Sequence, residues 1–215
     1  MIETSATKID AAAKFWDRIA DRYAAKPVAD EGVYQEKLRL TRTHLTPNSR
    51  LIEIGCGTGS TALAHVPFVK HILATDLSTR MLEIAEGKAD LQQIRNITFR
   101  QSALKDLIVQ DGGVDAVLAM SVLHLLPDRD EAARRIHGLL KPGGVFVSST
   151  ACLGDGLRIF GLIGPIGRAL GLLPLIRIFT ADELVDSLVA AGFQIETRWE
   201  PGKHKGVFVI ARRPE

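Results

Sequence analysis

The residues best suited to chemistry form an alternating series that begins at Glu53 and continues with Gly55, Gly57 and Gly59. Glycines after a strand let the backbone turn sharply and approach a ligand, which then faces the N-terminus of the next helix. A carboxylate at the strand end attracts an ammonium group and repels a pyrophosphate. Asp76 follows 23 residues later, at the end of the next apolar run, where a carboxylate suits a bidentate hydrogen bond to ribose hydroxyls. The two features predict a site for a ligand with an ammonium group and a ribose.

Two other interpretations of this loop stay open. A dinucleotide site follows the pattern Gly-x-Gly-x-x-Gly/Ala, and its last position falls on Ser60 here. Ser60 and Glu53 therefore argue against an NAD(P)-dependent oxidoreductase, which remains an alternative. The other alternative is a glycine-rich turn that holds no ligand.

The elements that would position these residues alternate along the chain. Apolar runs predict strands, and stretches of helical periodicity with Ser, Thr or Asp at their starts predict helices. The expected strands are 51–54, 72–75, 97–99, 114–119, 145–148, 194–199 and 207–211, and the expected helices include 31–45, 78–89, 128–140 and 180–191. Residues 141–144 are expected to form a turn, and residues 201–206 a hairpin loop. The alternation indicates a parallel sheet covered on both faces.

The composition is that of an ordinary globular chain with one unusual stretch. Of the 215 residues, 46% are hydrophobic and 24% are charged, so a single domain spanning 1–215 can bury a full core. A net charge of +2 gives no concentrated basic face for nucleic acid, and two cysteines fit a reduced, cytoplasmic setting. No signal peptide is apparent at the start. Residues 156–181 lack any acidic residue and are mostly apolar.

Several motifs together resemble one family. Residues 51–59, Leu-Ile-Glu-Ile-Gly-Cys-Gly-Thr-Gly, resemble the first motif of class I S-adenosylmethionine (SAM)-dependent methyltransferases. Residues 74–78 with Met81, 114–117 with 122–127, and 139–144 resemble later motifs of that family, in the family's order. The resemblance implies an α/β, Rossmann-like fold with a seven-stranded, mostly parallel sheet. It also implies a C-terminal antiparallel hairpin, helices on both faces and an N-terminal helical lid at 1–47.

The resemblance implies SAM as the cofactor, with no metal. Gly55, Cys56 and Gly57 would hold its methionine part, and Glu53 would position its amino group through water. Asp76 would bind the ribose. Further residues would face the methionine or the adenine, and these are Met120, Ser121, Leu77 and Met81.

Two of these residue assignments need a further remark. Tyr23 resembles an N-terminal tyrosine that closes over the cofactor carboxylate, and packing of its helix on the core is the alternative. After the third strand the family usually has an acidic residue that accepts a hydrogen bond from the adenine amino group, but Ser102 stands there. A hydroxyl accepts this bond more weakly than a carboxylate. Ser102 and Ala103 are therefore assigned to the adenine.

Methyl transfer from a sulfonium is an in-line displacement, and a base is needed only when the nucleophile arrives protonated. His124 is the first candidate base because it follows the fourth strand, at the edge where the methyl group is expected. The alternative is a histidine that packs in this loop. His204, in the hairpin loop, is the second candidate, and a solvated basic turn is its alternative.

The apolar stretch falls where this family inserts its substrate-recognition element, and we expect a lid over 152–180. Prolines, glycines and Arg168 argue against one membrane-spanning helix. The lid would line a pocket for a lipophilic small molecule. Alternatively, residues 157–179 would rest on a membrane and admit a lipid, or form a plain cap or a dimer contact. A non-catalytic SAM-binding partner protein is the remaining alternative. The acceptor and the oligomeric state are left open.

Overall fold

The structure is a computed structural model that describes residues 5–155, 173–202 and 206–215. Seven strands form one sheet in the order β3-β2-β1-β4-β5-β7-β6. Their bounds are β1 Arg50–Ile54, β2 His71–Asp76, β3 Ile97–Gln101, β4 Val114–Met120, β5 Leu140–Thr150, β6 Gln194–Trp199 and β7 Val207–Arg212. Strands β1 to β5 run parallel to one another, whereas β7 is antiparallel to both β5 and β6. The expected sheet with its antiparallel hairpin is confirmed.

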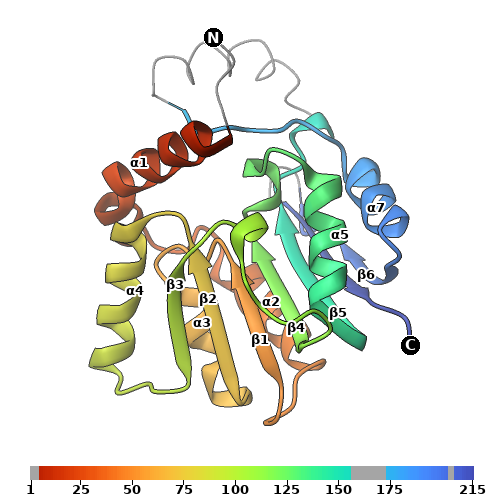
Figure 1. Cartoon of the computed structure of the whole chain (residues 1–215), viewed down its shortest axis with the longest axis horizontal. Coiled ribbons are helices and arrows are strands. Elements are labelled where there is room, and N and C mark those ends of the chain that lie inside the picture. The colour runs from red at the N-terminus through yellow and green to blue at the C-terminus, as the bar shows by residue number, and fades with distance from the viewer. Residues whose placement is uncertain (1–4, 156–172, 203–205) are drawn as a thin grey trace.

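Helices cover both faces of this sheet (Figure 1). The helices are α1 Ser5–Ala24, α2 Glu31–Arg42, α3 Ser60–His65, α4 Thr79–Leu91, α5 Arg129–Leu139 and α7 Ala181–Ala190. Leu40 of α2, Ala62 of α3 and Leu82 of α4 belong to one hydrophobic cluster against the sheet. Ile136 of α5 and Leu184 of α7 belong to the other. The two clusters make the three-layer arrangement of a doubly wound α/β fold.

Side-chain caps start four of these helices: Asp30 caps α2, and the other three follow here, of which the sequence predicts Ser78 and Thr180. Ser78 accepts a hydrogen bond from the Met81 amide at α4, and Asp128 accepts one from the Glu131 amide at α5. At α7, Thr180 and Glu183 form a reciprocal capping box. Each cap satisfies an amide that has no partner within its own helix.

Two elements differ from the sequence prediction. Helix α2 ends at Arg42 rather than near Leu45, because the chain turns through Thr43. Strand β5 begins at Leu140, so residues 141–144 lie inside the strand rather than in a turn before it. These residues pair with the chain after β7, since the Gly143 amide donates to the Arg213 carbonyl and the Arg213 amide to that of Gly144. This pairing could not be read from the local Lys-Pro-Gly-Gly pattern.

Helix α1 lies across the edge of the sheet where β1 and β2 end, next to α4 (Figure 1). Asp17 fixes it there, because one carboxylate oxygen accepts from the Ser78 hydroxyl at 2.6 Å and from the Arg80 amide at 3.0 Å. A carboxylate at a helix N-terminus is stabilised by the partial positive charge of that terminus. Helix α1 therefore covers this edge of the sheet, whereas α2 packs beside α3.

Only part of the expected 152–180 lid can be described, because residues 156–172 lie outside the described residues. Of the helices that the structure describes, none is long and apolar enough to cross a membrane. The described end of the segment is attached to the loop after β4. The Arg177 amide donates to the His124 carbonyl at 2.7 Å, and the Arg177 guanidinium donates to the Pro127 carbonyl at 3.0 Å.

Candidate cofactor and acceptor site

The glycine loop after β1 needs backbone conformations and space that only glycine supplies. Gly55 has a φ of +62°, and a Cβ there would lie 2.5 Å from Cγ2 of Val122. Gly59 has a φ of +75°, and its Cβ would lie 2.8 Å from Cβ of Ala85 on α4. The loop is thus packed between the chain after β4 and α4. A side chain at either position would push the loop out of place.

Asp76 ends β2 and is bonded to the backbone on both sides. Its Oδ2 accepts from the Gly57 amide at 2.8 Å, and its Oδ1 accepts from the Ser78 amide at 2.9 Å. Burial raises the pKa of its carboxyl, and these backbone hydrogen bonds oppose the shift. A carboxylate has about four acceptor positions, so both oxygens can still accept from a ligand hydroxyl. The side chain is held in place before any ligand arrives.

Glu53 is a buried carboxylate with an unused acceptor. Its residue is 2% exposed, and its Oε2 has no hydrogen-bond partner among the described residues. Burial, and then the nearby charge of Asp76, raise the pKa of this carboxyl to about 8. An ammonium group arriving above it, directly or through water, would offset the cost of burying the charged form.

A cavity of about 900 Å³ lies over the glycine loop and Asp76, whereas Glu53 lies below the loop and is not among the described residues that line it. The sheet edge contributes Gly55, Gly57, Asp76, Met120 and Ser121, and α1 contributes Phe15, Trp16 and Tyr23. The remaining wall is apolar over most of its area, and its apolar residues include Val122, Leu125, Leu126, Ala132, Leu173 and Leu175. Charged side chains border this end as well, namely those of Lys105, Asp128, Glu131, Arg135 and Arg177. The volume lies near the upper end of the roughly 300–1,000 Å³ typical of small-molecule sites. The cavity therefore has a polar end and an apolar end.

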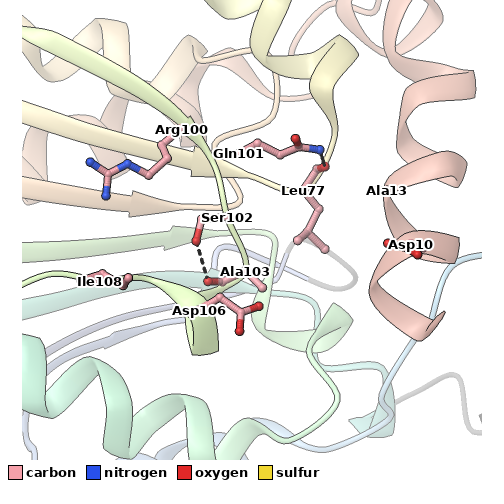
Figure 2. Close-up of a pocket in the computed structure, with 9 residues that line it drawn as sticks. All are labelled: Asp10, Ala13, Leu77, Arg100, Gln101, Ser102, Ala103, Asp106 and Ile108. Carbon is pink, nitrogen blue, oxygen red and sulfur yellow. Dashed lines mark hydrogen bonds between the residues drawn. The ribbon is translucent and has the colours of Figure 1, made fainter. Parts of the chain in front are cut away.

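A second cavity of about 410 Å³ adjoins the polar end, and Figure 2 shows the residues that line it. Leu77, Ser102 and Ala103 line both cavities. Met81 also faces the larger cavity, although it is only 2% exposed. The structure thus brings together four of the residues that the sequence assigns to an adenine.

Tyr23 lines the larger cavity from α1 and packs edge to face against Trp16. Burial raises the pKa of its phenol, with a smaller contribution from Asp76. Met120 and Ser121 line the same cavity at the end of β4, where Ser121 has a φ of +60°. Such a conformation is uncommon outside glycine and is often kept at functional sites.

Cys56 lies in the same loop, but its side chain packs in the hydrophobic core on the α3 side. Burial raises the pKa of its thiol well above the ordinary range. Only the backbone of Cys56 is therefore available to a ligand over the loop. The assignment of this residue to the cofactor is limited to that backbone.

His124 lies in the short helical turn Leu123–Leu125 after β4. Burial lowers the pKa of its imidazole to about 4, and Nδ1 finds no partner within the described part of the chain. Its neighbours Val122 and Leu125 line the larger cavity, whereas His124 is not among the described residues that do. His124 is therefore a neutral imidazole behind the apolar wall.

His204, the second candidate base, lies outside the described residues, as do Lys203 and Lys205. Strand β6 is antiparallel to β7, which is antiparallel to β5, so the hairpin loop opens at the same edge as the cavity. Trp199, at the end of β6, packs edge to face on Phe208. Across the described segments, no group of three or more His, Cys, Asp or Glu side chains could hold a metal ion.

Sequence reasoning missed two contacts that shape the site. Asp17 anchors α1, as described above. Lys37 of α2 is 8% exposed and donates to the Ser149 hydroxyl at 2.8 Å, next to the Ser149 carbonyl that accepts from the Ser121 amide. Both contacts join residues that are far apart in the sequence, and no local pattern marks them.

The comparisons with known proteins agree with this geometry. A family model described as a methyltransferase domain matches residues 52–148, which include the glycine loop, Asp76, Ser102 and the loop after β4. Over residues 52–148, the chain matches a methyltransferase domain of the class I SAM-dependent type.

Two curated methyltransferases are similar over part of this chain. An uncharacterized methyltransferase, YcgJ of Bacillus subtilis (strain 168), is 28% identical over 127 residues, or 57% of this chain and 50% of that protein. A ubiquinone biosynthesis O-methyltransferase of Xanthomonas campestris pv. campestris (strain B100) is 31% identical over 105 residues, or 48% of this chain and 44% of that protein. The chain therefore spans about half the length of these relatives.

The fold extends beyond the matched segment. The crystal structure of geranyl diphosphate C-methyltransferase from Streptomyces coelicolor A3(2), in complex with Mg²⁺, geranyl diphosphate and S-adenosyl-L-homocysteine, has a TM-score of 0.74 to this chain. The two share 15% sequence identity, over 98% of this chain and 100% of the other. At that identity the likeness concerns the fold alone.

Three features of this chain fit SAM, the cofactor of class I methyltransferases. The unused Oε2 of buried Glu53 suits an ammonium group, and the fixed Asp76 carboxylate suits a ribose. A Cβ at Gly57 would meet no atom within 4 Å, so the space over the loop is open. Chemically, the residues present match a nucleoside that carries an amino acid.

Proposed function

We propose that this chain transfers the methyl group of SAM to an oxygen or nitrogen of a small, lipophilic acceptor, leaving S-adenosylhomocysteine. The observation that carries the proposal is the two-ended cavity of about 900 Å³. Its polar end contains the residues of the family's cofactor motifs. Its apolar end begins at Met120 and Val122, directly beyond that site, and supports an apolar acceptor beside the cofactor.

We assign residues of this chain to bind each part of the cofactor. When bound, SAM supplies an electrophilic methyl group on a sulfonium. Gly55, Gly57 and the backbone of Cys56 hold the methionine part, and Glu53 accepts from its ammonium group. The ribose hydroxyls donate to Asp76. Contacts to the rest of the molecule come from Leu77, Met81, Ser102, Ala103, Met120, Ser121 and Tyr23.

At the acceptor end, the lining side chains orient the acceptor and exclude water from it, and they do not react with it. Leu125, Leu126, Leu173 and Leu175 exclude water and select an apolar molecule. A phenolic or hydroxyl acceptor must also lose a proton. His124 is the first candidate to accept it. Because His124 does not line the cavity as described, and burial lowers its pKa to about 4, this role requires the imidazole to turn toward a bound acceptor. His204 in the hairpin loop is the second candidate for this step.

The names of the relatives support a lipophilic acceptor. Some are named ubiquinone biosynthesis O-methyltransferase or demethylmenaquinone methyltransferase, and a structural relative is a geranyl diphosphate C-methyltransferase. These names describe those proteins. For this chain they give a class of acceptors to test first, and quinols and other apolar phenols head that class.

The test incubates the protein with methyl-labelled SAM and each of two panels of acceptors. It measures the label transferred to the acceptor and the S-adenosylhomocysteine that is left. One panel contains quinols and alkyl phenols, and the other contains polar amines, nucleotides and peptides. We expect labelled product with the apolar panel and at most background with the polar one. Binding of SAM with no turnover on either panel would instead favour a non-catalytic SAM-binding protein.

A further inference from the structure

The smaller cavity gives access to one edge of the proposed adenine site. It shares Leu77, Ser102 and Ala103 with the larger cavity, so the two meet at these three residues. The remaining polar side chains of the smaller cavity are those of Asp10, Arg100, Gln101 and Asp106. An adenine lying between Leu77 and Ala103 would present one of its edges to these groups.

The two polar residues at the end of β3 are turned back onto the backbone. The Gln101 amide donates to the Leu77 carbonyl at 2.9 Å, and the Ser102 hydroxyl donates to the Ala103 carbonyl at 3.0 Å (Figure 2). The Ser102 hydroxyl oxygen can therefore offer an adenine amino group only a weak, uncharged acceptor. A buried amino group prefers a charged acceptor, because hydrogen bonds to ionised groups are roughly twice as strong as neutral ones.

Asp106 supplies such an acceptor at the same wall. The short turn Leu104–Asp106 follows Ala103, and the Asp106 amide donates to the Ala103 carbonyl at 3.1 Å. In Figure 2 the Asp106 carboxylate lies beside Ala103, on the side of the cavity that faces α1, whereas the Arg100 guanidinium extends the other way. Arg100 is thus not placed to neutralise it.

The carboxylate of Asp106 also keeps free acceptor capacity. Its Oδ1 accepts from Lys105 Nζ at 2.8 Å, and both side chains of this pair are about half exposed. Exposed pairs of this kind contribute little, so Lys105 can yield to a ligand. Its Oδ2 accepts no hydrogen bond from the described residues.

We propose that Asp106, four residues beyond the usual position, accepts the hydrogen bond from the 6-amino group of the cofactor's adenine. The proposal rests on the proposed function, because it requires SAM in the larger cavity. Ser102 and Ala103 then form the wall against the base. Asp10 of α1 also lines the smaller cavity, as a second carboxylate on this side of the site.

The test compares S-adenosylhomocysteine with S-inosylhomocysteine, in which a carbonyl replaces the 6-amino group. We expect the unsubstituted chain to bind the adenosyl compound about tenfold tighter or more by calorimetry. Asp106→Ala should remove most of that preference by weakening the adenosyl compound, with the inosyl compound little changed. Adding Ser102→Asp to Asp106→Ala should restore the preference, because it returns a carboxylate to the family's usual position.

Asp90→Ala is the matched control, since Asp90 pairs with nearby Arg95 at the surface as Asp106 pairs with Lys105. It should leave both affinities unchanged, and thermal unfolding checks that every variant is folded. If Ser102→Ala removes the preference and Asp106→Ala does not, the amino group belongs to Ser102 and the proposal is wrong. Equal affinity of the unsubstituted chain for both compounds also overturns it. If neither compound binds, the proposed function fails with it.

Discussion

At the scale of single residues, Asp76 has a role in both the fold and the site. Its two oxygens accept from the Gly57 and Ser78 amides, so the carboxylate ties the glycine loop to the start of α4. The same oxygens are the proposed acceptors for the ribose. Because a ligand meets a carboxylate already held in position, little side-chain entropy is lost on binding.

Asp76→Ala should weaken SAM binding by about tenfold or more, because two charge-assisted hydrogen bonds are lost. Calorimetry with purified variant measures this. Asp76→Asn is the control, since an amide oxygen can still accept from one hydroxyl and should give an intermediate loss. An unchanged affinity in folded Asp76→Ala would overturn the ribose assignment.

Glu53 makes the stability of the ligand-free protein depend on pH. Its pKa in the folded protein is raised from 4.5 to about 8 by burial and by Asp76. Between these values the folded state keeps a proton that the unfolded state releases. The contribution of Glu53 to stability is therefore full below pH 4.5 and declines as the pH rises through about 8, by an amount on the order of a few kcal/mol.

Glu53→Gln should remove this decline, because the amide does not ionise. Denaturant unfolding of both proteins from pH 5 to 9 should show the parent losing stability relative to the variant as the pH rises. Saturating SAM should narrow the difference, since its ammonium group favours the ionised carboxylate. Parallel pH profiles for parent and variant would mean that Glu53 ionises normally in the folded state.

His124→Ala should lower turnover on a phenolic acceptor far more than SAM affinity if His124 accepts the proton. A control is His65→Ala, because His65 is also buried with a pKa lowered to about 4 but lies on α3. Turnover per folded molecule should survive that second change. Equal turnover of His124→Ala and the parent would make His124 a packing residue and leave His204 as the candidate base.

At the scale of elements, the attachment of α1 decides whether the cavity is covered. Asp17→Ala removes the acceptor for the Ser78 hydroxyl and the Arg80 amide, and should cost about 1–2 kcal/mol of stability. Amide hydrogen exchange should rise throughout α1 and SAM affinity should fall. Asp21→Ala is the control, because Asp21 pairs with the same Arg80 at the exposed surface and should have a smaller effect. Unaltered exchange in Asp17→Ala would show that packing alone holds α1.

The elements themselves were largely predictable, because their signals are local. The apolar run 51–54 and its glycines, and the caps Ser78, Asp128 and Thr180, each act within a few residues, and the structure has the expected elements there. The start of β5 was not predictable. Leu140 pairs with Val114 of β4, and Gly143 and Gly144 pair with Arg213, so the extension of β5 depends on partners that are distant in the sequence.

The site was predictable where the motif and the strand ends coincide, and not where contacts are long-range. Gly55, Asp76 and Ser121 lie at the strand ends that the alternating pattern indicates. The Asp17–Ser78 and Lys37–Ser149 contacts join separate elements through tertiary packing, so no residue spacing in the sequence indicates them. The place of Asp106 beside Ala103 follows from a tight turn that the sequence around Leu104 does not signal.

At the scale of the whole molecule, the strand order determines where the ligand lies. Strands β1 and β4 are neighbours although β2 and β3 come between them in the sequence, so the connections leave β1 and β4 in opposite directions. Ligands of open α/β sheets bind at such a switch point, beyond the carboxyl ends of the strands. The glycine loop, Asp76 and Met120 all lie there, and α1 and residues 173–177 border the same cavity.

The central claim is that this cavity holds SAM rather than a nicotinamide dinucleotide. Calorimetry of the unsubstituted chain against SAM, S-adenosylhomocysteine, NAD and NADP tests it most directly. We expect saturable binding of the first two, weakened about tenfold or more in Asp76→Ala, and no binding of the dinucleotides. Saturable binding of NAD or NADP with none of SAM would contradict it.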